Sequence, residues 1–329
     1  MLILLYLVGG LALILLSAEI FTNGIEWLGK RLKLSEGAVG SVLAAVGTAL
    51  PEAMIPVMAI LFGTGDAAHE IGIGAILGAP FMLATLALCI TGIAALVYTV
   101  NGRKREFMHI DDTIMKRDLQ FFILVYSVAI LAAFLPVAYK LPVAILLVLA
   151  YIIYVSRTIK AGGAQGESEV KPLHFAKKYE QPATSVILLQ VLTALVGIVV
   201  GAHFFVDGIE HVAELLHISP FILSIFIAPI ATELPEKFNS LIWVRQGKDT
   251  LALGNITGAM VFQSSMIPAM GIALTPWVLN DLALISALLA LAGAGLVYLS
   301  LQIKKSLRPS TLVLTGGLYA AFVMSAFIV

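Results

Sequence analysis

Long apolar segments alternate with short polar ones along the whole chain. A helix that crosses the hydrocarbon layer of a membrane needs about 20 mostly apolar residues, and ten stretches of this sequence meet that requirement. Because ten is an even number, both ends of the chain are expected on one side of the membrane. The predicted spans are residues 2–21, 38–62, 71–98, 119–137, 141–157, 184–206, 219–244, 251–275, 281–302 and 310–329.

The composition indicates which class of protein carries this pattern. Hydrophobic residues make up 60% of the chain and charged residues 12%, with a mean hydropathy of +1.01. A soluble domain carries about 25% charged residues, so the sequence predicts an all-α integral membrane protein. The formal net charge is zero, which excludes the strongly basic face that nucleic-acid binding requires.

The basic residues predict the orientation in the membrane. Eighteen of the 20 Lys and Arg residues lie in connections that follow the odd-numbered spans, and cytoplasmic loops collect Lys and Arg near helix ends. The other connections hold only Lys140, while Lys237 lies inside a span. We therefore expect a multi-pass protein of the cell membrane with both termini outside the cytoplasm. Its expected partners are the lipid bilayer and transported cations.

An internal repeat divides the chain into two halves. Residues 18–52 align with residues 202–236 without a gap, and the aligned pairs include Leu50-Pro51-Glu52 with Leu234-Pro235-Glu236. By the expected topology the two copies enter the membrane from opposite sides, as in many secondary transporters, whose sites lie at mid-membrane where the copies meet. The expected parts are a first five-helix repeat over residues 1–160, a cytoplasmic linker over 161–182 and a second, inverted five-helix repeat over 183–329.

Each repeat carries a Pro-Glu pair near the middle of its second span. Proline removes a helical hydrogen bond, so Pro51 and Pro235 are expected to kink or break their helices and to free backbone carbonyls. A carboxylate at the bilayer centre costs roughly 2.5 to 3.5 kcal/mol on insertion scales and marks a functional site. Carbonyls and carboxylates are the hard oxygen ligands that Ca²⁺ and Mg²⁺ prefer. Glu52 and Glu236 are therefore the predicted centre of a metal site.

Further oxygen donors lie close to these carboxylates in the sequence. Thr48 and Thr232 stand four residues before the two glutamates and share a helix face with them, although a hydroxyl bonded back to its own helix is the common alternative. Asn255 and Gln263 offer side-chain oxygens on the eighth span. Small residues four apart, at Gly74 and Gly78 and again at Gly254 and Gly258, predict close helix packing.

Two more charges appear in the second repeat only. Glu233 and Lys237 stand where the first repeat has Ala49 and Ala53, and their spacing of four favours an ion pair on one helix face. If they pair, Lys237 serves as a tethered cation. The alternative is that Lys237 extends toward the membrane interface while Glu233 joins the metal site directly.

With these motifs, the sequence resembles the membrane domain of the sodium/calcium exchangers, within the cation/Ca²⁺ antiporter superfamily. That family is built from two inverted five-helix halves, each with a G-T-S-x-P-E run followed by G-N-x-x-G-S-N. The runs here read Gly47-Thr48-Ala49-Leu50-Pro51-Glu52 and Ala231-Thr232-Glu233-Leu234-Pro235-Glu236. The resemblance implies that the two Glu and the two Thr bind the transported cation and that polar side chains of the eighth span complete neighbouring sites.

The sequence also departs from this family at several positions. Ala49, Ala75, Ala79, Ala259 and Leu83 stand where the resembling exchangers supply oxygens that help to hold Na⁺. The departures predict weak Na⁺ coupling. Protons are the natural substitute, because a buried carboxylate can exchange H⁺ for a metal ion.

The sequence therefore predicts a secondary antiporter, not an enzyme, that exports a divalent cation by alternating access and needs no resident cofactor. The transported ion is Ca²⁺ by resemblance, with Mg²⁺ or Mn²⁺ as alternatives, and the counter-ion is H⁺ or Na⁺. A divalent-cation channel or uncoupled facilitator would use the same carboxylates. A remote alternative is an intramembrane aspartyl protease, whose G-x-G-D motif is matched by Gly63-Thr64-Gly65-Asp66.

Overall fold

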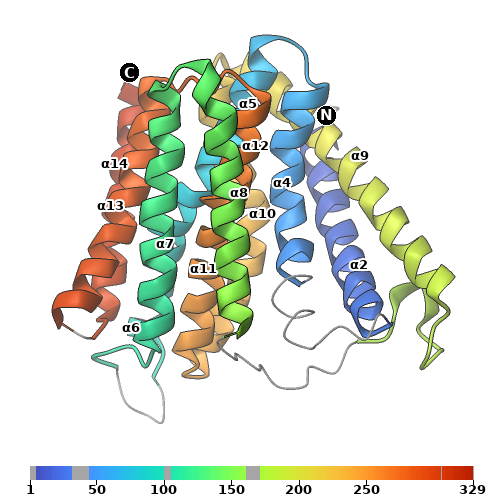
Figure 1. Ribbon diagram of the computed structural model, residues 1–329, viewed down its shortest axis with the longest axis horizontal. Coiled ribbons are helices and arrows are strands. Elements are labelled where there is room, and N and C mark those ends of the chain that lie inside the picture. Colours follow the sequence, from blue (N-terminus) through green and yellow to red (C-terminus); the bar gives the residue numbers. More distant parts are fainter. Residues whose placement is uncertain (1–4, 32–43, 100–104, 161–170, 305, 329) are drawn as a thin grey trace.

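The computed structural model describes residues 5–31, 44–99, 105–160, 171–304 and 306–328, and these residues form a bundle of helices without strands (Figure 1). The elements of the first half are η1 (Leu5–Gly9), α2 (Gly10–Arg31), α4 (Ala44–Phe62), α5 (Gly65–Met82), η3 (Leu83–Ala87), α6 (Leu88–Val97), α7 (Asp112–Leu131), η4 (Ala132–Phe134) and α8 (Val137–Lys160). Those of the second half are η5 (His174–Ala176), α9 (Thr184–Leu216), α10 (Pro220–Arg245), α11 (Asp249–Gln263), α12 (Met266–Leu274), α13 (Asp281–Lys304) and α14 (Pro309–Ile328).

The helices account for the ten predicted spans. Within the described residues, 8 helical segments are long and apolar enough to cross a membrane. The other two spans are α4 and α10, which contain the shorter apolar segments Glu52–Phe62 and Pro220–Glu233. The prediction of an all-α membrane protein built from two inverted five-helix repeats is thereby confirmed.

The two ends of the bundle differ in charge. The first described residue of η1 and the last residues of α14 lie at the same end (Figure 1). Among the described residues, the opposite end carries the ends of α2, α6, α8, α10 and α13, and basic residues gather near these helix ends. We call it the basic end.

The helices α2 and α9 form a tilted pair at one edge of the bundle (Figure 1). Glycines line their contact: a Cβ added to Gly10 would lie 2.8 Å from the carbonyl oxygen of Gly201, and one added to Gly201 would lie 2.9 Å from that of Gly10. Both helices continue past their predicted ends at residues 21 and 206 to Arg31 and Leu216. Polar residues end the apolar run there but do not interrupt the helix.

Buried side-chain amides of α2 and α9 form hydrogen bonds with part of the predicted linker. Asn23 Nδ2 of α2 donates to the Lys171 carbonyl at 3.2 Å, and its Oδ1 accepts from the His174 backbone N–H at 3.1 Å. Gln190 of α9 accepts from the Phe175 N–H at 2.9 Å and donates to the carbonyl of Ile20 on α2. The start of the linker, residues 161–170, lies outside the described residues.

Helix interruptions occur at equivalent positions of the two repeats, but not at the predicted prolines. The expected break at Pro51 and Pro235 is not found, because α4 and α10 run through these residues as single helices. Neighbouring helices make a proline tolerable in a membrane span. The interruptions lie instead in the third span of each repeat, as the π-helical turn η3 and as the break between α11 and α12 at Ser264 and Ser265.

Candidate cation site

The site is built where four helices of the two repeats meet, since α4, α5, α10 and α11 pack against one another. Gly74 and Gly78 bring α5 against α10: a Cβ on Gly78 would lie 2.5 Å from the carbonyl oxygen of Ile225, and one on Gly74 would lie 2.8 Å from that of Phe221. The predicted packing role is confirmed for these two glycines. For Gly254 and Gly258, no described atom lies within 4 Å of an added Cβ, and their packing role stays a prediction.

Glu52 supplies a carboxylate from the interior of α4. Glu52 is 7% exposed and lies inside α4, which begins at Ala44. The buried residues Ile55 and Met58 follow it along the same helix. Thr48 lies one turn earlier in the same helix, but its side chain is outside the described residues. A buried carboxylate in an apolar span keeps its charge only with a cation or a polar partner.

The equivalent part of α10 carries Thr232 and Glu236. Thr232 is buried, and its hydroxyl donates to the carbonyl of Ala228 at 3.0 Å, which is the local backbone bond expected as the alternative to a ligand role. Glu236 follows one turn later within α10, and its side chain lies outside the described residues. Because Pro235 has no N–H, the carbonyl of Ala231 loses its usual helical donor and can accept elsewhere.

A second acidic residue of α10, Glu233, already interacts with other side chains of the protein. The side chain of Glu233 is 2% exposed, and its Oε1 accepts from Gln263 Nε2 of α11 at 3.0 Å. Its Oε2 lies 3.3 Å from Nζ of Lys237, which is itself buried. The two residues thus lie together as their spacing of four suggests, and Lys237 does not extend to the membrane interface.

The predicted donors Asn255 and Gln263 of α11 both bond to side chains of α10. Asn255 Nδ2 donates to Oγ of Ser240 at 3.2 Å. Ser264 and Ser265, at the break after α11, both donate to the carbonyl of Val261 in the preceding turn. Among the residues whose side chains are described, no group of three or more His, Cys, Asp and Glu comes together to hold a metal ion. The predicted cation site would thus combine the two repeated carboxylates with backbone, hydroxyl and amide oxygens.

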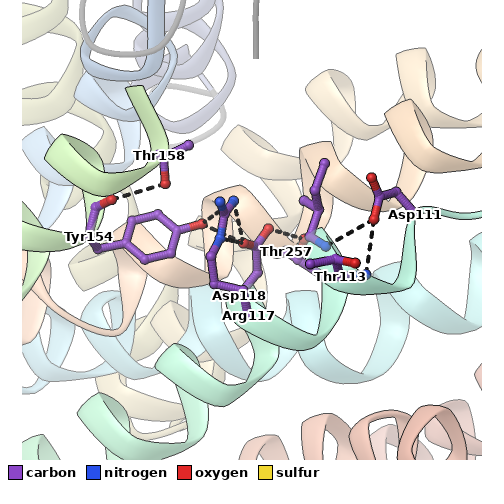
Figure 2. A network of polar contacts seen from close by, with 8 residues as sticks. Asp111, Thr113, Arg117, Asp118, Tyr154, Thr158 and Thr257 are labelled. Carbon is purple, nitrogen blue, oxygen red and sulfur yellow. Dashed lines mark hydrogen bonds and ion pairs between the residues drawn. The ribbon is translucent and has the colours of Figure 1, made fainter. Parts of the chain in front are cut away.

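A buried polar network between the repeats was not predicted (Figure 2). Asp118 of α7 is 3% exposed and accepts from the Tyr154 hydroxyl of α8, from the Arg117 guanidinium at 3.1 Å and from Thr257 Oγ1 of α11 at 2.9 Å. It lies just before the predicted start of its span at residue 119, so the hydropathy pattern did not mark it as buried. The network joins the first repeat to α11, the helix that carries Asn255 and Gln263.

Comparison with known proteins identifies the group to which this arrangement belongs. A family model described as "Sodium/calcium exchanger protein" matches residues 2–160 and 186–328. The chain belongs to the sodium/calcium exchanger family. Members of this family are secondary transporters and not enzymes, and the relatives and structures below are membrane proteins and exchangers. The unmatched segment between residues 160 and 186 contains the predicted linker.

Similar proteins and solved structures cover most of the chain. The "Uncharacterized membrane protein MJ0091" of Methanocaldococcus jannaschii is 26% identical over 258 residues, which are 78% of this chain and 76% of that protein. The crystal structure of the H⁺/Ca²⁺ exchanger CAX has a TM-score of 0.73 at 17% identity and covers 99% of this chain and 82% of its own. The sodium-calcium exchanger NCX_Mj has a TM-score of 0.60 at 21% identity, with 99% and 98% covered. At these identities the two structures show a shared fold.

Proposed function

We propose that this protein is an antiporter that exports Ca²⁺ across the cell membrane in exchange for protons, by alternating access. The proposed ion ligands are the carboxylates of Glu52 and Glu236 with oxygens of Thr48 and Thr232, where the two repeats meet. The observation that carries the proposal is the carboxylate of Glu52, which is buried inside an apolar helix and is repeated in the inverted copy by Glu236. The counter-transport named for CAX and NCX_Mj supports it.

The choice of proton over sodium rests on the chemistry of the missing donors. The side chains of Ala49, Ala79 and Leu83 supply no oxygen. A carboxylate must lose its proton to bind a metal, so metal binding and proton release are coupled. Mg²⁺ and Mn²⁺ are the alternative divalent ions, and Na⁺ is the alternative counter-ion.

Ion flux in reconstituted vesicles tests this function. With purified protein in liposomes, Ca²⁺ uptake is expected to saturate, to accelerate with an outward-directed proton gradient and to change little with a sodium gradient at fixed pH and voltage. Competition by Mg²⁺ and Mn²⁺ ranks the ions. Ca²⁺ flux down its own gradient without any counter-ion would instead indicate a channel or facilitator. Strong acceleration of Ca²⁺ flux by a sodium gradient would show that Na⁺, and not the proton, is the counter-ion.

The orientation is a separate part of the proposal. The basic residues support a cytoplasmic position for the basic end, where Gln246 is exposed in the connection from α10 to α11. Val278 is exposed in the connection from α12 to α13 at the other end. An impermeant thiol reagent added outside intact cells is expected to label Val278→Cys and to spare Gln246→Cys. The reverse labelling would show the opposite orientation in the membrane and would contradict the direction of transport proposed here.

A further inference from the structure

An ion pair lies beside the proposed cation ligands on one repeat only. Oε2 of Glu233 and Nζ of Lys237, both on α10, are 3.3 Å apart, and the two side chains are 2% and 6% exposed. Gln263 of α11 donates to the other carboxylate oxygen of Glu233 at 3.0 Å. The equivalent positions of the first repeat are Ala49 and Ala53, which carry no charge. The pair is therefore an addition to a site whose other acidic residues are symmetric.

The burial of Lys237 makes its charge part of the membrane interior. A lysine usually reaches the interface with its long side chain, but this ammonium group is held at the carboxylate of Glu233. A charge buried in this way is kept only when a charge of opposite sign stays beside it. Lys237 thus acts as a monovalent cation that is attached to the protein and cannot leave with the transported ions.

The number of mobile charges that the site can hold follows from the sequence. Outside the first and last two turns, the charged residues of α4, α5, α6, α10, α11 and α12 are Glu52, Glu233, Glu236 and Lys237. Glu70, in the second turn of α5, accepts hydrogen bonds from Ser219 and from the Phe221 N–H at the start of α10. Glu233 and Lys237 cancel each other. Two negative charges remain, those of Glu52 and Glu236, and they are balanced either by one divalent cation or by two monovalent cations.

We propose that Lys237 is a built-in counter-cation that fixes the exchange at two monovalent ions for each divalent ion, without net movement of charge. This inference rests on the proposed exchange function and names its stoichiometry. The carboxylate of Glu233 then neutralises the charge of Lys237 and is not a ligand of the transported metal. The reasoning holds equally for protons and for sodium, since it depends only on their charge.

Removal of the tethered cation is expected to change the transported charge. In Lys237→Met, the carboxylates of Glu52, Glu233 and Glu236 carry three negative charges, so a third monovalent ion enters the exchange. One net charge then crosses the membrane in each cycle. A potential of 100 mV acts on one elementary charge with about 2.3 kcal/mol, which changes the final Ca²⁺ gradient about 50-fold.

The experiment measures Ca²⁺ accumulation by the full chain in liposomes whose potential is set with potassium and valinomycin, at fixed proton and sodium gradients. The wild type is expected to reach the same Ca²⁺ gradient at 0 and at 100 mV. Lys237→Met is expected to gain the voltage dependence calculated above. Lys237→Arg retains the charge and is the matched control, and the double variant Glu233→Gln with Lys237→Met restores two negative charges. Both are expected to remain independent of voltage.

Each outcome decides between this inference and the function beneath it. Absence of any Glu52-dependent Ca²⁺ flux in the wild type would count against the exchange function itself. A wild type that transports Ca²⁺ with strong voltage dependence overturns the role of Lys237 even if no variant folds. Voltage independence of an active Lys237→Met variant, or voltage dependence of the double variant, overturns it as well.

Discussion

The two repeats present the same small-residue motif in opposite surroundings. On α5, Ile71, Gly74 and Gly78 are buried against α10. On α11, the equivalent Leu251 is 37% exposed and Gly258 is exposed as well.

The neighbours explain the difference as far as the structure describes them. Phe221, Ser224 and Ile225 of α10 cover the glycines of α5, and Ser224 also donates to the Ile71 carbonyl at 2.7 Å. The counterparts of these three residues are Gly37, Gly40 and Ser41, which lie outside the described residues. Within the described residues, the two repeats therefore differ in what covers this motif.

The prediction with the largest expected effect tests whether the two repeats contribute equally to ion binding although their described packing differs. Glu52→Gln and Glu236→Gln are each expected to reduce Ca²⁺ flux at least about 100-fold, since a divalent ion loses half of its neutralising charge in a medium of low dielectric. The measurement is Ca²⁺ flux in liposomes, with thermal stability as the check on folding. Glu214→Gln, at an exposed position near the end of α9, is the matched control. Near-normal flux in either site variant would refute the symmetric two-carboxylate site.

The second prediction concerns the charges that only one repeat has. Glu233→Ala or Lys237→Ala leaves a buried charge without its ion-pair partner and is expected to lower the free energy of unfolding by about 3 to 5 kcal/mol. The double variant is expected to recover part of this loss. A double-mutant cycle on thermal or denaturant unfolding in detergent measures the coupling. Losses that simply add would show that the pair contributes nothing and would return Glu233 to the list of metal ligands.

The third prediction compares the two glycine faces directly. Gly78→Ala places a methyl group 2.5 Å from backbone of α10 and is expected to cost about 1 to 3 kcal/mol, as overpacking does. Gly258→Ala meets no described atom within 4 Å and is expected to leave the melting temperature unchanged. Equal damage from both substitutions would break the comparison, because it would mean that residues beyond the described ranges cover α11 as α10 covers α5.

The smallest expected difference between a variant and its control concerns the contact between the repeats through Asp118. Thr257→Val removes a hydrogen bond to a buried carboxylate, worth about 1.5 to 3 kcal/mol. The control Thr91→Val removes a hydroxyl that is also buried but donates to its own helix at the Ala87 carbonyl, where about 0.5 to 1.5 kcal/mol is typical. Unfolding of the two variants in detergent gives the difference. A larger loss in Thr91→Val would show that Asp118 does not hold α11.

Local patterns predicted most of the fold and the symmetric part of the site. Apolar runs marked all ten spans because each helix has to fill the thickness of the membrane. The internal repeat identified Glu52 and Glu236 as equivalent residues. The spacing of Glu233 and Lys237 suggested a pair, but only the burial of Lys237 decided against its extension to the interface.

Features that depend on distant partners could not be predicted in this way. Asp118 meets Thr257 across 139 residues of sequence, and no local pattern records such a meeting. The interruptions in the third spans were missed for a related reason. Pro51 and Pro235 looked like break points by their chemistry, but packing of the surrounding helices kept α4 and α10 continuous.

The buried amide of Asn23 has a consequence for the synthesis of the protein. Its partners Lys171 and His174 follow 148 and 151 residues later in the chain, and Gln190 follows 167 residues later. When α2 first leaves the ribosome, none of these partners exists, so the newly inserted helix must present Asn23 to water, lipid headgroups or the insertion machinery until α9 arrives. The first half of the protein is therefore expected to remain unfinished in the membrane until the second half has been made.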